Sequence, residues 1–189
     1  MTALQNSEAA YSQGNTKSKW SNRFVWAAIV QGLAVTLLTI PIVWPPDGLF
    51  GIKVSPSVAS VFAGESAGIG YTLGYLSYIM VGVIAVGLTA LFYYHFEVSI
   101  SKPYKGVANY LAWAHLIFMN VGVAAATYML MWGGYFGGAA LINGKTAEWV
   151  YVNILSGLVD PIGYAIIVIG IGVLAGGLGY LINYYFTKR

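Results

Sequence analysis

The sequence predicts an all-α polytopic membrane protein in which four helices form a transmembrane bundle. Of its 189 residues, 58% are hydrophobic and only 8% are charged, whereas about a quarter of the residues in a soluble domain are charged. The apolar residues also fall into four long runs. About 20 apolar residues at roughly 1.5 Å each cross the hydrocarbon core of a bilayer. We therefore expect lipid to surround most of the chain.

Charge and cysteine content exclude several classes of function. The net charge is +3, but the basic residues stand at the ends of the apolar runs, and no basic run is dense enough to predict nucleic-acid binding. Cysteine is absent, which excludes disulfides, thiolate metal sites and haem attached through paired cysteines. The sequence also lacks a phosphate-binding loop, a nucleophile elbow and a histidine pair with metal-ligand spacing.

The chain divides into a polar tail and a single transmembrane domain. Residues 1–22 are rich in Ser, Asn and Gln and predict a cytoplasmic tail, which leaves residues 23–187 for the membrane domain. The tail has no apolar stretch like that of a cleavable signal peptide, so the first span should both target and anchor the chain. That span is predicted at 24–44 and ends at Pro45 and Pro46, because two prolines cannot continue a helix.

The second and third spans are predicted at 68–94 and 107–141, with a short connection that contains Lys102 and Lys105. Because short connections join neighbouring elements, these two spans should pack antiparallel as the central hairpin of the protein. The third span is longer than a bilayer requires, so it should tilt or project beyond the membrane.

The fourth span, predicted at 149–186, contains the dipeptide Asp160-Pro161 and has two interpretations. If the span begins near Trp149, Asp160 lies about 16 Å into the membrane. An unpaired charge there costs at least roughly 3 kcal/mol, so this buried acid would be protonated, paired or in contact with water. If the helix begins at Pro161 instead, Asp160 is an ordinary N-cap with proline at the first helical position.

The basic residues predict that both termini lie in the cytoplasm. With four spans, only Lys53 and Lys145 fall on the side away from the termini. The positive-inside rule therefore assigns the terminal side to the cytoplasm. The basic residues on that side are Lys17, Lys19, Arg23, Lys102, Lys105, Lys188 and Arg189.

Glycines four residues apart predict close packing between helices, because they let two backbones approach in lipid. With 24 glycines in the chain, part of this pattern is expected by chance, so it identifies no partner. The pairs are Gly70 and Gly74, Gly133 and Gly137, Gly134 and Gly138, and Gly172 and Gly176.

Several stretches between residues 68 and 186 together resemble a known family. Residues 75–78 read Tyr-Leu-Ser-Tyr and are followed by the aromatic residues 92–94. This helix resembles the one in haem-copper oxidase subunit I that carries two haem-ligating histidines in a His-Phe-His-Tyr motif. Residues 114–122 are similar to the next helix of that family, and the turn at 143–145 with the last span is similar to its last helix.

The resemblance implies a shortened relative without the family's catalytic centre. Tyr75 and Ser77 stand where the family has its haem ligands, and neither can ligate iron as imidazole does. The earlier helices that bear the copper ligands have no counterpart in this sequence. We therefore expect an accessory, non-catalytic subunit beside a larger membrane subunit of a respiratory terminal oxidase, such as a cytochrome or quinol oxidase, or of a similar electron-transfer complex. This interpretation implies no cofactor of its own and a location in the plasma membrane of a prokaryote.

Polar residues inside spans are functional candidates in a membrane, and two of them suggest alternatives. His115 could hold a single haem b in an electron-transfer protein, although an interhelical hydrogen bond is the commoner role of such a residue. His95 should lie at a different depth, so the two histidines are not expected to share a haem. Asp160 could serve a small transporter or channel, because broken helices with buried acids mark ion paths. Gln31 is expected to hydrogen-bond a neighbouring helix.

Overall fold

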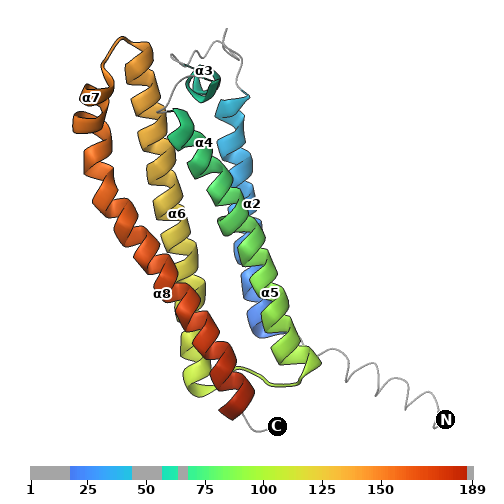
Figure 1. Ribbon diagram of the computed structural model, residues 1–189. Helices are drawn as coiled ribbons and strands as arrows, with labels where there is room; N and C mark the ends of the chain where they lie inside the picture. Colours follow the sequence, from blue (N-terminus) through green and yellow to red (C-terminus); the bar gives the residue numbers. More distant parts are fainter. Residues whose placement is uncertain (1–17, 44–56, 64–67, 187–189) are drawn as a thin grey trace, which may run out of the picture.

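The computed structural model describes residues 18–43, 57–63 and 68–186, and within these residues the protein is all-α (Figure 1). The segment 1–17, most of the predicted tail, lies outside them. Four helical spans in this part of the chain are long and apolar enough to cross a membrane: Lys19–Ile42, Gly68–Ser99, Gly106–Ile142 and Ala147–Phe186. The predicted fold class is confirmed to this extent. The cytoplasmic location of both termini stays a prediction.

The second and fourth spans each combine α-helical and π-helical segments, whereas the first and third are single α-helices. The first span is α2 (Lys19–Ile42), and the short helix α3 (Val58–Ala63) precedes the second span. The second span consists of α4 (Gly68–Ser77), η1 (Tyr78–Ala85), α5 (Val86–Tyr94) and η2 (His95–Ser99). The third is α6 (Gly106–Ile142), and the fourth consists of α7 (Ala147–Val150), η3 (Tyr151–Leu155) and α8 (Ser156–Phe186).

The first helix begins at Lys19, before the predicted start of the first span and within the residues 1–22 predicted as a tail. Ser18 is the N-cap of α2, and its Oγ accepts a hydrogen bond from a first-turn backbone N–H at 3.2 Å. The carboxylate of Glu97, on the second span, accepts from the Trp20 backbone N–H at 2.9 Å and from the Ser18 hydroxyl. Because these acceptors satisfy N–H groups that the first turn leaves free, the helix extends past its apolar run.

Each span packs mainly on the next one along the chain. The first span packs on α5 and η1, α4 packs on α6, and α6 packs along most of α8 (Figure 1). The predicted pairing of the second and third spans is therefore present, but the most extensive contact joins the third and fourth. α2 and α6 make few direct contacts.

The spans end close together at one end of the molecule, which we call the charged end. Glu97 joins the start of α2 to the end of the second span. The Trp20 indole N–H donates to Asn109 Oδ1 on α6 at 3.2 Å. Asn183 Nδ2, near the end of α8, donates to the Lys102 carbonyl oxygen at 2.8 Å. These contacts hold the four spans level at the charged end.

The spans are not level at the opposite end, because their lengths differ. The first has 24 residues, the third 37 and the fourth 40, or roughly 36, 56 and 60 Å at about 1.5 Å per residue. Leu38 and Ile42, in the last turns of α2, pack on a cluster that contains Met131 of α6. Residues beyond this level, about 133–159, extend past the end of α2, and we call this helical hairpin the hairpin tip.

An aromatic cluster fills the interior at the charged end. Trp20, Phe24 and Tyr93 are completely or almost completely buried, and the rings of Phe24 and Tyr93 stack at 4.8 Å between centroids. Tyr104, in the connection between the second and third spans, completes the cluster and is 6% exposed. Burial, and to a lesser extent the nearby Tyr180 and Glu97, raise the pKa of the Tyr104 phenol, which therefore stays neutral at physiological pH.

Candidate functional site

His115, the residue predicted as a candidate haem ligand, lies inside this aromatic cluster. It is 5% exposed, and its ring centroid is 5.1 Å from that of Phe24. Its Nδ1 lies 3.2 Å from the Tyr93 hydroxyl oxygen. The ring also lies directly over Gly176 of α8, where a Cβ would collide with it. Side chains and backbone from four spans thus enclose the imidazole, which is the geometry of an interhelical hydrogen bond.

The two histidines lie in different surroundings. The second span continues to Ser99 instead of ending near residue 94, and His95, in its last segment, is exposed and packs edge-on against Phe96. His115 is buried, and its ring contacts Tyr93. The different depths expected for the two histidines stay a prediction.

A polar network joins three spans about halfway along α2. Gln31 is 8% exposed; its Nε2 donates to Asn120 Oδ1 of α6 at 3.0 Å, and its Oε1 accepts from the Tyr78 hydroxyl. Asn120 Nδ2 donates in turn to the Leu116 carbonyl oxygen at 2.7 Å. Gln31 thus bonds neighbouring helices, as the sequence predicted. The partners of Gln31 were not predicted. Asn120 could have been predicted as one of them, because it is a second amide inside an apolar span.

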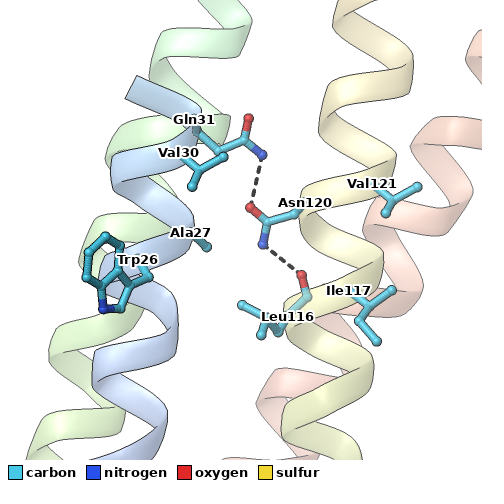
Figure 2. Close-up of a pocket in the computed structure, with 8 residues that line it drawn as sticks. All are labelled: Trp26, Ala27, Val30, Gln31, Leu116, Ile117, Asn120 and Val121. Carbon is cyan, nitrogen blue, oxygen red and sulfur yellow. Dashed lines mark hydrogen bonds between the residues drawn. The ribbon is translucent and has the colours of Figure 1, made fainter. Parts of the chain in front are cut away.

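The two amides lie at the floor of an open groove between α2 and α6 (Figure 2). The groove has a volume of about 400 Å³. Each amide nitrogen has two N–H groups and donates one hydrogen bond in the network. Amides do not titrate, so the groove offers apolar walls and hydrogen-bonding groups but no acid or base. Its lining residues are Trp26, Ala27, Val30, Gln31, Leu116, Ile117, Asn120 and Val121.

Asp160 lies within a continuous helix, so the predicted N-cap and the predicted break in the fourth span are both wrong. α8 begins at Ser156 and includes Pro161 in its interior, and η3 and α7 precede it directly. Proline removes the helical N–H that would bond the Gly157 carbonyl, but membrane helices tolerate such an interruption. The Asp160 side chain lies on the surface of the described chain, and its depth in the membrane stays a prediction. Within the described part of the chain its carboxylate makes no hydrogen bond or ion pair.

The glycines predicted to pack helices lie on the contacts that α6 makes with α4 and α8. A Cβ at Gly74 would lie 2.7 Å from the Thr127 carbonyl oxygen, and one at Gly172 would lie 2.8 Å from the Met119 backbone nitrogen. Real Cβ atoms do not approach other atoms so closely, so both helices lie against the backbone of α6. The other predicted members, each in such a contact or buried, are Gly70, Gly133, Gly134, Gly137, Gly138 and Gly176.

Two further observations bear on function. The described residues contain no group of three or more His, Asp or Glu side chains that could hold a metal ion. Comparison with protein-family models, with curated proteins and with solved structures found no match to this chain. The resemblance to haem-copper oxidase subunit I therefore depends on the residues quoted above alone.

Proposed function

We propose that this protein is an accessory, non-catalytic integral membrane subunit that contributes surface to a larger membrane complex. The observation that carries the proposal is the unequal length of its spans. The third span has 13 residues more than the first (37 against 24), which is about 20 Å of helix. Because the spans are level at the charged end, this excess lies at the other end. The length of α2 is close to that of a bilayer core of about 30 Å, so in this proposal α2 marks the hydrocarbon region and the hairpin tip extends beyond it.

The surface of the hairpin tip is too apolar for a segment that faces only water. Besides Tyr151, it presents five large apolar side chains that are between 40% and 60% exposed. Removing such a side chain from water contributes roughly 1.5–3 kcal/mol, and exposed apolar patches of this kind mark protein interfaces. A partner subunit that covers the tip accounts for both its length and its composition. The five residues are Phe136, Ile142, Trp149, Val152 and Val159.

The interior of the protein supports a structural role as well. His115 bonds Tyr93 across two spans, and Gln31 bonds Asn120 and Tyr78 across three. These polar groups are used between helices of the same chain. Asp160 is not part of this interior, and the unbroken fourth helix removes the feature on which a transporter or channel interpretation depended.

The resemblance to subunit I favours a respiratory terminal oxidase of the haem-copper type, or a similar electron-transfer complex, as the assembly to test first. The partner would then be a larger, haem-bearing membrane subunit in the plasma membrane of a prokaryote. The alternative of a single haem b held by His115 makes a different prediction. It requires a Soret band in the isolated protein that His115→Ala abolishes.

Affinity purification of the tagged full chain from native membranes in a mild detergent tests the proposal. We expect a larger membrane protein to co-purify at fixed stoichiometry, with any haem absorption belonging to that partner. Trp149→Ser on the tip should weaken co-purification, whereas Leu37→Ser, at a 66% exposed position on α2, should leave it unchanged. Recovery of the chain alone from native membranes, under conditions that keep other membrane complexes intact, would contradict the proposal.

A further inference from the structure

One face of α8 is used by the protein and the opposite face is not. Gly172 and Gly176 lie against α6, where an added Cβ would meet Met119 or His115. On the other side of the helix, a Cβ at Gly163, Gly170 or Gly177 would find nothing within 4 Å. These three glycines are spaced by seven residues, which places them on one stripe of a helix. Nothing in the described chain fills the space beside them.

Large side chains alternate with these glycines along the same face. Ile167, Leu174 and Leu181 are 59%, 68% and 55% exposed, and they too are spaced by seven. Each follows a glycine of the first stripe by four residues. Together the two stripes form a heptad seam, with apolar knobs at one position and glycine holes at the other, which is the pattern that receives a second helix. We call this surface the α8 seam (Figure 1 shows α8 crossing in front of α6).

Asp160 occupies the first knob position of the α8 seam, seven residues before Ile167. Because Gly133 of α6 faces Leu158 and the two helices run in opposite directions, Asp160 is about level with Met131. Met131 packs on the cluster joined by Leu38 and Ile42 at the end of α2. Asp160 therefore lies near the membrane boundary on the side of the hairpin tip, and the described chain supplies no partner for its carboxylate.

The charge identifies the kind of helix that fits. Two copies of this chain insert in the same orientation, so a symmetric dimer through the seam would bring Asp160 of one copy to the depth of Asp160 of the other, and the two like charges would repel. A lysine or arginine on a different chain would pair with the carboxylate. Near the boundary such a long side chain can also reach the headgroups, which lowers the cost of placing it there.

We infer that the α8 seam docks one transmembrane helix of a different chain, and that this helix presents a lysine or arginine to Asp160. The inference depends on the proposed function, because it names the surface that the partner subunit covers and the chemistry by which it is recognised. It adds a second interface to the hairpin tip, within the membrane instead of beyond it.

Photo-crosslinking of the full chain in native membranes tests this inference. A photoreactive benzophenone amino acid replaces Ile167 in the seam or, as a matched control, Leu37 on the exposed side of α2. We expect position 167 to give one discrete adduct whose cross-linked peptide is a transmembrane segment with a lysine or arginine near one end. Position 37 should give none. Asp160→Asn should reduce the adduct roughly tenfold, as expected for an interhelical polar contact in a membrane, and Asp160→Glu should retain it.

Gly170→Leu provides an independent variant, because it fills a hole of the seam without touching this chain. It should abolish the adduct while the isolated protein keeps its elution volume and thermal stability in detergent. An adduct of this chain with itself, adducts with lipid only, or an adduct that Asp160→Asn leaves unchanged would each overturn the inference. If a partner co-purifies but position 167 gives no adduct, the inference fails and the proposed function stands. If no partner co-purifies, both fail.

Discussion

Two glycines of α8 that are only two residues apart should respond oppositely to the same substitution. A Cβ at Gly172 would lie 2.8 Å from the Met119 backbone nitrogen and 3.1 Å from the Phe118 Cβ, whereas a Cβ at Gly170 meets nothing within 4 Å. Ordinary contacts begin at 3.4 Å, so Gly172→Ala requires α8 and α6 to separate locally by about 0.6 Å (3.4 minus 2.8). Backbone atoms cannot rotate away, so the longest helix contact of the protein must adjust.

The magnitudes follow from general values. Overpacking by one methyl group in a tight contact costs roughly 1–3 kcal/mol, and alanine in a helix interior is favoured over glycine by up to about 1 kcal/mol. Gly172→Ala should therefore destabilise the isolated protein by up to about 2 kcal/mol, and Gly170→Ala should leave it unchanged or stabilise it by up to about 1 kcal/mol. Reversible unfolding in mixed micelles of mild and denaturing detergent measures the free energy of unfolding. Equal free energies for the two variants would refute the register of α6 against α8.

Three further predictions test other parts of the structure. The same unfolding assay can be applied to a double-mutant cycle of Gln31→Leu and Asn120→Leu. The coupling free energy between the two substitutions should be about 0.5–1.7 kcal/mol, the range for interhelical polar contacts in membranes. Additive effects would mean that the two amides are not hydrogen-bonded to each other. Glu97→Gln should lower stability by roughly 1 kcal/mol, because the start of α2 loses a charged acceptor, and hydrogen exchange should then increase in the first turn of α2 but not at the turn after α6. Because the chain has no cysteine, a single cysteine introduced by Val152→Cys or by Leu37→Cys can be labelled alone. In the purified protein, reconstituted in lipid without a partner, a membrane-impermeant maleimide should modify the cysteine at position 152 and not the one at position 37. Protection of position 152 from the maleimide would contradict the projection of the hairpin tip.

The spans could be predicted because lipid imposes a length and a composition on each one, and both are properties of a single stretch of sequence. The start of α2 could not be predicted in this way. Its first turn is stabilised by Glu97, a residue 77 positions away from Trp20 in the chain, and no local pattern records such a contact. The end of the second span was missed for a similar reason, because the polar residues after Tyr94 continue the helix through η2.

The candidate site shows a different limit of sequence reasoning. Asp160-Pro161 is a strong helix-start signal in water, where an aspartate N-cap followed by proline satisfies the first turn. In this chain the apolar run continues on both sides of the dipeptide, and membrane helices accept an interior proline. Periodicity was the better guide here: continuing the helix through Pro161 places Asp160 in line with Ile167 and Leu174, on the face opposite the glycines that meet α6.

The glycines of α8 explain why sequence alone did not separate packing within the chain from packing against a partner. Gly172 and Gly176 and, on the other face, Gly163, Gly170 and Gly177 have the same chemistry and similar neighbours in sequence. Only the register of α6 against α8 decides which of them already touch a backbone. Once that register is known, the remaining glycines become informative, because a helix that met only lipid would gain nothing from a second stripe of small residues. Under the docking inferred above, the outer stripe would receive the partner helix, and the Asp160 carboxylate at the head of that stripe would select it.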